Sequence, residues 1–346
     1  MNLESWLPFV RDAFMDAFFY EVFDEEREAI ERYLPAGLAV EMTPATPQEH
    51  GAEAPPAAIL STRTQSAIPH AWGSKLRALL TRSTGYDHVV RYAREANFTG
   101  ACGYLPLYCA RAVAEQACML WMALLRKLPV QRAQFAAFHR DGLTGREALD
   151  KMLLVVGVGN IGHEIVQIGR GLGMKVLGVD LDPRHDDVEY VSIEAGLPKA
   201  DILACAMNLT ADNAGYFNAE RLAKCKPGAI FVNVARGELS PTADLLAALD
   251  NGQLAGVGLD VYENESALAC ALRAGEFGIQ DKKTEASTQT PAVAAALELA
   301  KRSDAILTPH NAFNTAEALE RKARQTVESL KAFLQTGAFP HPVPVG

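Results

Sequence analysis

Short apolar runs alternate with amphipathic segments along most of this 346-residue chain. In the second half, six apolar runs of strand length are each followed by a helical pattern or a polar loop, which predicts parallel strands joined by crossover helices. The six predicted strands are LLVVGVG (153–159), KVLGVD (175–180), DILACAM (201–207), AIFVNVA (229–235), LAGVGLDV (254–261) and AILTPH (305–310). This alternation is typical of a doubly wound α/β sheet.

The first half of the chain shows the same alternation. Its apolar runs predict strands at 17–23, 37–43, 57–63 and 75–83. EEREAIERYL (25–34) predicts a helix that ends at Pro35 and Gly37. Residues 44–56 are rich in proline, glycine, alanine and glutamate and predict a loop, whereas residues 1–15 predict an additional amphipathic helix.

Three longer helical patterns complete the outline. Residues 110–128 form a pattern without internal glycine or proline, and this helix could bridge two domains. Residues 291–303 and 317–336 predict two further helices, the second near the end of the chain. The polar segment 275–289 predicts a surface loop inserted between elements.

The segment MLLVVGVGNIG (152–162) carries the most informative motif, because an apolar strand runs directly into Gly157, Gly159 and Gly162. The first glycine permits a tight turn, the second lets the backbone approach phosphate oxygens, and the third lets the following helix pack closely on the strand. The positive N-terminus of that helix, predicted at 163–173, then faces the anion. The context of strand, glycines and helix predicts a dinucleotide pyrophosphate site.

An acidic residue follows the next strand at the expected distance. Asp180 lies 18 residues after Gly162, where a carboxylate can accept hydrogen bonds from both ribose hydroxyls and repel a 2′-phosphate. This favours NAD over NADP. Asp182 could compete for the role, and Arg184 is a possible partner for a 2′-phosphate.

Composition and charge narrow the class of protein. With 49% hydrophobic and 22% charged residues, the chain is typical of a globular protein, and its length suits two domains. The net charge of −9 argues against nucleic acid or an anionic membrane as a partner. No secretory signal is evident, and the longest apolar run, 117–125, is too short to span a bilayer. The six cysteines show neither metal-site nor disulfide spacing, so we expect reduced thiols in a cytoplasm and no metal.

Three ionisable residues stand at the carboxyl ends of predicted strands, where open α/β sheets bind ligands. They are Arg236, Glu265 and His310. A guanidinium can bind a carboxylate, an imidazole can exchange a proton, and a carboxylate can orient that imidazole. Each also has an ordinary explanation: a salt bridge, a solvated acid beside Glu263, or a satisfied histidine. Together with a nicotinamide cofactor they could reduce a 2-oxo acid.

The chain resembles the D-2-hydroxyacid dehydrogenases, most closely the D-lactate dehydrogenase branch, over nearly its whole length. The segments that carry the resemblance are TRSTGYDHV (81–89), YLPLYCARAVAEQ (104–116), LLVVGVGNIG (153–162), FVNVARGELSPTADLLAALDNGQLAGVGLDVYENE (231–265) and TPHNAFNT (308–315). Long ordered matches of this kind are far more specific than the glycine motif alone.

The resemblance implies roles for the matching residues. Arg236 would bind the substrate carboxylate and carbonyl oxygen, His310 would be the acid and base, and Glu265 would hydrogen-bond His310 and favour its protonated form. The spacing of 29 residues from Arg236 selects Glu265 over Glu263. The backbone N–H groups of Thr84 and Gly85 would hold the substrate carboxylate, and Tyr108 would line the pocket, although a core role for Tyr108 is almost as well supported. The implied cofactor-binding residues are Gly157, Gly159, Asn160, Ile161, Gly162, Asp180, Asn208, Ala235 and Asp260, the last near the nicotinamide carboxamide.

The chain departs from the family pattern at a few positions. Gln116 replaces the usual histidine and is expected to affect domain packing, and Asn208 replaces a proline beside the cofactor. The 45 residues from Glu265 to His310 are more than the branch leads us to expect, with the excess in the polar loop. Arg63 could receive a second anionic group of a substrate, or it could be a surface arginine.

The predicted architecture is α/β, with two doubly wound parallel-sheet domains, one Rossmann-like and one flavodoxin-like, and a cleft between them. We expect residues 1–112 and 311–346 to form the substrate domain and residues 113–310 the NAD-binding domain. The predicted function is hydride transfer between NADH and a small 2-oxo acid to give a D-2-hydroxy acid, in a cytoplasmic homodimer. The alternatives are a dehydrogenase for a bulkier or doubly anionic 2-oxo acid, and an NAD-sensing binding module of the corepressor type.

Overall fold

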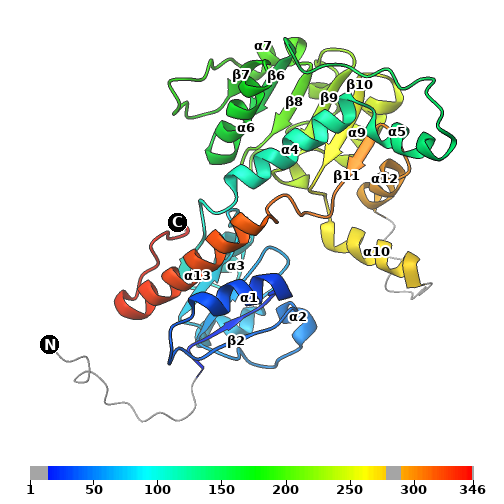
Figure 1. Cartoon of the computed structure of the whole chain (residues 1–346). Coiled ribbons are helices and arrows are strands. Elements are labelled where there is room, and N and C mark those ends of the chain that lie inside the picture. Colours follow the sequence, from blue (N-terminus) through cyan, green and yellow to red (C-terminus); the bar gives the residue numbers. More distant parts are fainter. Residues whose placement is uncertain (1–14, 278–289, 345–346) are drawn as a thin grey trace, which may run out of the picture. The chain divides into compact units, whose positions relative to one another are not determined.

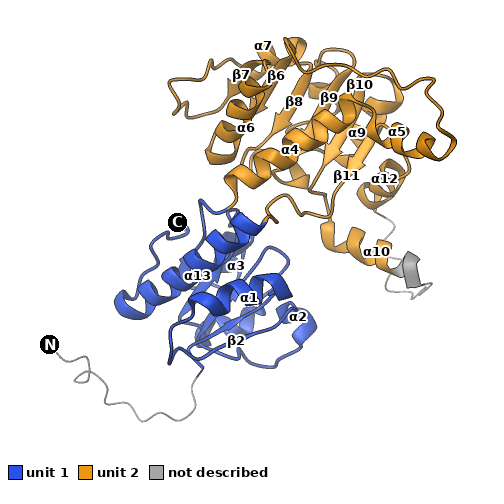
Figure 2. Cartoon of the chain, in the orientation of Figure 1, with its two compact units in different colours: residues 1–108, 316–346 blue, residues 109–315 orange. Residues whose placement is uncertain are grey.

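The computed structural model describes residues 15–277 and 290–344, and the chain divides into two compact units. Unit 1 comprises Met1–Tyr108 and Ala316–Gly346, and unit 2 comprises Cys109–Thr315 (Figure 2). The chain therefore leaves unit 1 after Tyr108 and returns to it at Ala316, which differs from the predicted transitions after residue 112 and at residue 311. Each unit is an α/β fold with a parallel sheet, as the sequence predicts.

Unit 1 has a sheet in the order β2-β1-β3-β4-β5, with all described neighbours parallel. This is the order of flavodoxin-like folds, in which the strand order reverses beside the first strand. Its strands are β1 (Ala17–Phe19), β2 (Val40–Met42), β3 (Ile59–Thr62), β4 (Ala78–Thr81) and β5 (Ala101–Gly103). Its helices are α1 (Asp24–Tyr33), α2 (Pro47–His50), α3 (Asp87–Glu95), α13 (Ala316–Thr336) and the 3-10 helix η1 (His70–Lys75) (Figure 1).

The four strands predicted for this unit are confirmed in shortened form, and the helices α1 and α13 are confirmed to within one residue at each end. The predicted loop at 44–56 is wrong over Pro47–His50, because Thr46 caps a short helix there. The Thr46 side chain accepts from the Glu49 N–H, and the Glu49 carboxylate accepts from the Thr46 N–H. Both β5 and α3 were missed. The helix predicted at 1–15 falls almost entirely outside the described residues.

Unit 2 has a parallel sheet in the order β11-β10-β9-β8-β6-β7. The strand order reverses at β6, whose neighbours β7 and β8 follow it in the chain, and such a switch point is where doubly wound sheets bind ligands. The strands are β6 (Met152–Val156), β7 (Lys175–Val179), β8 (Ile202–Cys205), β9 (Ala229–Asn233), β10 (Leu254–Leu259) and β11 (Ala305–Leu307). All six predicted strands of the second half are thus confirmed.

Helices cover both faces of this sheet (Figure 1). They are α4 (Ala110–Leu125), α5 (Leu128–Gln134), α6 (Asn160–Gly171), α7 (Ile193–Gly196), α8 (Ala219–Leu222), α9 (Thr242–Asp250), α10 (Glu265–Phe277), α12 (Pro291–Leu299) and the 3-10 helices η2 (Phe135–Ala137), η3 (Leu197–Lys199) and η4 (Gly237–Leu239). Helix α4 packs on α6 and on strands β9 and β10.

Three helix predictions need correction. The expected bridging helix 110–128 ends at Leu125, because Lys127 adopts a left-handed conformation, and α4 lies wholly within unit 2. Helix α6 begins at Asn160, before the predicted start at 163. Helix α10 runs to Phe277, so the loop expected at 275–289 is wrong for its first residues, and residues 278–289 lie outside the described part of the chain.

Each unit has its own hydrophobic core. In unit 1 the buried side chains include Tyr20, Leu60, Trp72 and Leu79, and a second core in unit 2 gathers the apolar residues of β6, β8, β9 and β10. Burial of one such large side chain contributes about 1.5–3 kcal/mol to folding. Within residues 15–277 and 290–344, none of the helices has the length and apolar character that a membrane span requires.

Candidate active site

The carboxyl ends of the six strands of unit 2 lie in one row across the sheet. The last residues of neighbouring strands are paired in register, in the order Val179, Val156, Cys205, Asn233, Leu259 and Leu307. The predicted residues follow these ends: Asp180 after β7, Gly157 after β6, Asn208 after β8, Ala235 and Arg236 after β9, Asp260 and Glu265 after β10, and His310 after β11. The fold therefore places them along one edge of the sheet.

The glycine loop after β6 has the geometry that a dinucleotide requires. Gly157 has a φ of +89°, and a Cβ there would lie 2.4 Å from the Met207 Cα. Gly159 has no heavy atom within 4 Å of an ideal Cβ, so its backbone is open to a ligand. A Cβ on Gly162 would lie 1.9 Å from the carbonyl oxygen of Gly157, which explains why α6 needs glycine there. The open loop and the N-terminus of α6 fit a pyrophosphate.

The Asp180 carboxylate is held beside this loop. Its Oδ2 accepts a hydrogen bond from the Val158 N–H at 2.6 Å, and its Oδ1 accepts one from the Asp182 N–H at 3.0 Å. The exposed Arg184 guanidinium pairs with the Asp182 carboxylate at 2.7 Å. The structure thus fixes Asp180 next to the glycines, while Asp182 engages the arginine that could have met a 2′-phosphate.

The remaining cofactor candidates lie at turns around the same edge. Asn160 and Ile161 form the first turn of α6. The Ala235 N–H donates to the Asn233 side chain at 2.9 Å, and the Asn208 carbonyl oxygen accepts from the Asn213 side chain at 2.8 Å. These bonds hold the turns after β9 and β8 in place.

His310 and Glu265 form a direct pair. The His310 Nδ1 lies 2.9 Å and 3.0 Å from the two carboxylate oxygens of Glu265, and about a quarter of each side chain is exposed. Because a carboxylate only accepts, Nδ1 carries the proton of this hydrogen bond. His310 also has a φ of +50°, a strained conformation typical of functional sites.

Glu263, the alternative to Glu265, caps the N-terminus of helix α9. Its carboxylate accepts a hydrogen bond at 2.6 Å from the N–H of Thr242, the first residue of α9. A carboxylate at a helix N-terminus satisfies a backbone donor and interacts favourably with the helix dipole. The geometry therefore separates the two acids of the VYENE segment into a helix cap and a histidine partner.

A buried network holds the segment that carries His310. The Asp260 carboxylate accepts from the Thr308 hydroxyl at 2.6 Å and from the N–H groups of Asn311 and Ala312 at 2.9 Å and 2.8 Å. Burial raises the pKa of Asp260 above its ordinary value, and these hydrogen bonds partly oppose the shift. Gln116 on α4 donates to the Thr308 hydroxyl oxygen at 3.1 Å.

In this network Asp260 and Gln116 have hydrogen-bond partners that differ from those expected from the sequence. Asp260, expected beside the nicotinamide, has both carboxylate oxygens engaged by the turn around His310. Gln116, expected in domain packing, contacts Thr308 within unit 2. No spacing rule in the sequence could have linked residues 116, 260 and 308.

Arg236 directly follows the turn after β9. Its backbone is extended, with φ −143° and ψ 141°, and its carbonyl oxygen accepts from the Asn233 side chain at 2.8 Å. Its Nη1 donates to the carbonyl oxygen of Ala235 at 2.8 Å. The following Gly237 packs so closely on the backbone of Tyr262 that a Cβ would lie 1.9 Å from it. The turn that carries the guanidinium is therefore anchored to the segment after β10.

In unit 1 the predicted substrate-binding residues follow β4 and β5. The Ser83 hydroxyl donates to the Gly85 carbonyl oxygen at 2.6 Å, and the Thr84 hydroxyl donates to the Leu105 carbonyl oxygen at 3.1 Å, so two side chains of the loop hydrogen-bond to the backbone. Tyr108 is only 3% exposed, and the Lys322 Nζ lies 5.8 Å from its ring centroid. This burial fits the core role left open for Tyr108.

A buried ion cluster, defined here as Glu26, Arg82 and Lys322, lies beside that loop. The Glu26 Oε1 lies 2.9 Å from the Arg82 Nε and 2.6 Å from the Lys322 Nζ, and all three side chains are fully buried. The Arg82 guanidinium also donates to the Ser61 hydroxyl and to the carbonyl oxygens of Tyr20 and Glu21. The residue immediately before Ser83 thus ties the ends of β1 and β3 to α1 and α13.

The cluster shifts the pKa values of its members. Burial raises the pKa of Glu26, but Arg82, Lys322 and Arg63 outweigh it and lower that pKa to about 2. Burial lowers the pKa of Lys322, and the two guanidiniums of Arg63 and Arg82 add to this effect against the opposing attraction of Glu26. The contribution of Glu26 to stability is therefore present above its ordinary pKa and is lost as the pH falls towards about 2.

We expect E26Q to destabilise unit 1 by about 3–5 kcal/mol, because it leaves two buried cations without their carboxylate. K322M is the matched control. It removes a lysine whose charged form is disfavoured by burial, and it keeps the Arg82–Glu26 pair. K322M should therefore destabilise unit 1 less than E26Q does. Urea unfolding followed by tryptophan fluorescence, to which Trp72 of unit 1 contributes, measures both. If E26Q lowered the free energy of unfolding no more than K322M does, this explanation of the cluster would be contradicted.

The family model of the D-isomer specific 2-hydroxyacid dehydrogenase NAD binding domain matches residues 118–312 of this chain. The match covers more than half of the chain and includes every strand of unit 2. The chain belongs to the D-isomer specific 2-hydroxyacid dehydrogenase family. This D-2-hydroxyacid dehydrogenase is an NAD-dependent oxidoreductase, and the open glycine loop described above fits that cofactor.

Curated relatives and solved structures extend the similarity to most of the chain. The D-lactate dehydrogenase of Leuconostoc mesenteroides subsp. cremoris is 28% identical over 92% of this chain and 96% of its own length. An aromatic 2-oxoacid reductase of Clostridium sporogenes is 29% identical over 75% of this chain and 76% of its own. The crystal structure of D-lactate dehydrogenase from Aquifex aeolicus with NAD and lactic acid has a TM-score of 0.78 and 27% identity, and covers 95% of this chain and 99% of that one.

The dehydrogenase should depend on the Glu265 carboxylate, because its two oxygens lie 2.9 Å and 3.0 Å from the His310 Nδ1. In E265Q the amide can still accept from Nδ1, but a hydrogen bond to a neutral acceptor is weaker than one to a carboxylate. We expect kcat in the reductive direction to fall about tenfold or more, a part of the roughly 10²–10⁴ that proton transfer contributes. Steady-state rates of E265Q, with E263Q as control, test this. An equal loss of kcat in both variants would contradict it.

Proposed function

We propose that this enzyme interconverts a small 2-oxo acid of about the size of pyruvate and the corresponding D-2-hydroxy acid. The observation that carries the proposal is the His310–Glu265 pair at the ends of two neighbouring strands, with Arg236 at the end of the third. A 2-oxo acid has a charged carboxylate, which a guanidinium can bind, and a carbonyl oxygen that must be protonated, which a histidine held by a carboxylate can do.

The proposed roles divide the reaction among these residues. NADH supplies the hydride when it is bound. Arg236 binds the substrate carboxylate and polarises its carbonyl oxygen, because a guanidinium can donate two parallel hydrogen bonds. His310 gives the proton on Nε2 to the oxygen that becomes the hydroxyl, and in the opposite direction it takes that proton back. Glu265 keeps the imidazole ring oriented and favours its charged form.

Cofactor binding is proposed for the residues along the edge of the sheet. The loop of Gly157 and Gly159 and the N-terminus of α6 suit the pyrophosphate. Asp180 would accept from the ribose hydroxyls with the lone pairs that its two backbone contacts leave. Asn208 and Ala235 are proposed to line the nicotinamide half, and Asp260 is proposed to act chiefly by holding the turn around His310.

In unit 1 we propose that the N–H groups of Thr84 and Gly85 bind the substrate carboxylate. The loop is suited to this because the Ser83 hydroxyl bond and the buried ion cluster fix its backbone. Tyr108 is proposed to shape the wall of the pocket with its ring rather than to react, since the side chain is almost fully buried.

A larger or doubly anionic substrate is the second candidate. The half-buried Arg63 follows β3 at the switch point of unit 1, and its guanidinium carbon lies 5.5 Å from the Phe23 ring centroid. A cation at this place could receive a second carboxylate. The aromatic substrates named for the Clostridium relative make bulkier 2-oxo acids a reasonable comparison.

Initial rates of NADH oxidation with pyruvate, glyoxylate, phenylpyruvate, 2-oxoisocaproate and 2-oxoglutarate test the proposal. We expect pyruvate to give the highest kcat/KM and D-lactate as the product. A clear preference for 2-oxoglutarate that disappears in R63Q would instead support the doubly anionic substrate. A preference for phenylpyruvate, or the L-isomer as product, would contradict the proposal.

We also propose a homodimer formed through unit 2. Phe135 and Phe138 are each 75% exposed at η2, and Leu128 of the adjoining α5 is 53% exposed. Exposed large apolar side chains grouped in this way are characteristic of contact surfaces.

Light scattering coupled to size exclusion is expected to show a dimer that F135S/F138S converts to a monomer. L272S, which changes an exposed leucine on α10, serves as control and should stay dimeric. A monomeric wild-type enzyme, or a dimer unaffected by the double substitution, would contradict this interface. The cytoplasm is the proposed location, which suits the six cysteines present as free thiols.

A further inference from the structure

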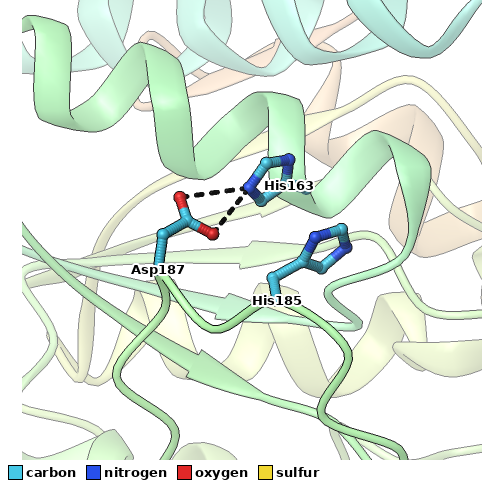
Figure 3. A group of neighbouring side chains, drawn as sticks. All are labelled: His163, His185 and Asp187. Atoms are coloured by element: carbon cyan, nitrogen blue, oxygen red, sulfur yellow. Dashed lines mark hydrogen bonds and ion pairs between the residues drawn. The ribbon is translucent and has the colours of Figure 1, made fainter.

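Two histidines and an aspartate converge at the surface of unit 2, and none of them is among the residues proposed for catalysis. His163 belongs to α6, and His185 and Asp187 lie in the segment after β7 (Figure 3). One ligand atom from each of the three residues lies within 4.8 Å of the other two. The His163 Nε2 is 3.1 Å and 3.2 Å from the two Asp187 oxygens. The imidazole rings of His163 and His185 are stacked, with centroids 3.9 Å apart and an angle of 6°.

The neighbours of this cluster hold its carboxylate in place. Gln167, one turn further along α6, and Arg170, two turns further along, each donate to the Asp187 Oδ2 at 2.8 Å. These two contacts fix the position of the Asp187 carboxylate, and outer contacts of this kind orient metal ligands in proteins.

We propose that His163, His185 and Asp187 bind one divalent transition-metal ion of the class that prefers imidazole, such as Zn²⁺ or Ni²⁺. Two imidazole nitrogens and one carboxylate oxygen are a ligand set for these ions, whereas Mg²⁺ and Ca²⁺ prefer oxygen ligands alone. The ion would replace the proton shared between the His163 Nε2 and Asp187, and water would complete its coordination. A surface salt bridge needs only one of the two histidines, so the second, stacked imidazole favours the metal site over that simpler explanation.

A metal ion at this position would link two segments of unit 2 and so stabilise its fold. His163 comes three residues after Asn160 at the start of α6, and His185 comes five residues after Asp180. A bound ion would therefore cross-link the first turns of α6 to the segment after β7, on either side of the glycine loop. Because an ion that binds only the folded chain stabilises it, the melting temperature should rise with the ion.

Isothermal titration of untagged full-length enzyme with ZnCl₂ at neutral to mildly alkaline pH tests the proposal. All forms carry C270S, because Cys270 is an exposed thiol that could bind zinc by itself. We expect one Zn²⁺ per chain, binding weakened by about tenfold or more in both H163Q and H185Q, and no comparable binding of Mg²⁺. The matched control is H139Q, since His139 and Asp141 form an exposed pair at 3.2 Å without a second histidine.

A second measurement separates loss of the site from loss of the fold. Each variant should keep the circular dichroism spectrum of the parent enzyme, and Zn²⁺ should raise the melting temperature of the parent and of H139Q but not of H163Q or H185Q. Absence of stoichiometric binding by the parent, or equal binding by H163Q, H185Q and H139Q, would overturn the proposal. If Zn²⁺ binding were lost in only one of the two histidine variants, the site with three protein ligands would be overturned.

Discussion

Replacing His310 by glutamine is expected to reduce kcat for oxo-acid reduction by about 10²–10⁴ or more, because it removes the group that gives a proton to the carbonyl oxygen. Glutamine can still donate to Glu265 and keeps the segment around residue 310 filled. The loss should therefore fall on chemistry and not on the fold. Steady-state rates with saturating pyruvate and NADH measure the change.

NADH binding is the control for this variant. The glycine loop and Asp180 belong to other strands than β11, so the fluorescence change of NADH on binding should occur at similar concentrations in H310Q and in the parent. H139Q, at an exposed histidine of the same unit, should keep full activity. Turnover in H310Q close to that of the parent would remove His310 as the proton donor.

Replacing Arg236 by glutamine is expected to raise KM for the oxo acid by about 10- to 100-fold, since a hydrogen bond to a charged group contributes about 1.5–3 kcal/mol. The KM of R236K for the oxo acid should lie between those of the parent enzyme and R236Q. Lysine keeps the positive charge but cannot donate the two parallel hydrogen bonds of a guanidinium. KM for NADH should change little in either variant.

The two Arg236 variants also distinguish substrate binding from structural support. If Arg236 only held its turn together through the bond to the Ala235 carbonyl oxygen, R236Q and R236K would lower stability and leave KM unchanged. An unchanged KM for the oxo acid in R236Q would contradict the assignment of the substrate carboxylate to this guanidinium.

Much of the fold could be predicted from periodicity because buried parallel strands are short and almost wholly apolar. All six strands of unit 2 satisfy that description. Strand β5 was missed because Ala101–Gly103 is only three residues long and includes a glycine. Helix α2 was missed because its four residues depend on the Thr46 cap rather than on an apolar face, and proline and glycine around it favoured a loop.

The chemistry of the site could be predicted in part because strand ends are visible in the sequence. Arg236, Glu265 and His310 each stand at or after the carboxyl end of a predicted strand, and the register of the sheet shows that those ends lie in one row. What could not be predicted were the contacts among loops. The engagement of Asp260 by the turn around His310 and the capping of α9 by Glu263 depend on how loops from different strands meet.

The buried ion cluster and the histidine cluster also could not be predicted from the sequence, because their members are far apart along the chain. Glu26 and Lys322 are almost 300 residues apart in the chain, and only the packing of α1 on α13 brings them to 2.6 Å. His163 and His185 are separated by a whole strand and loop. Neither spacing corresponds to a local motif, so pairs of this kind emerge only from the three-dimensional fold.

The central claim is that Arg236 and His310 act on one and the same substrate carbonyl oxygen. The most direct test is a crystal structure of the enzyme with NADH and oxamate, an unreactive analogue of pyruvate. The account predicts the His310 Nε2 and a guanidinium nitrogen of Arg236 both within about 2.7–3.2 Å of the amide oxygen that replaces the ketone, with the nicotinamide ring against the same group. An oxamate held by other side chains, with His310 Nε2 or Arg236 directed away from it, would contradict the account.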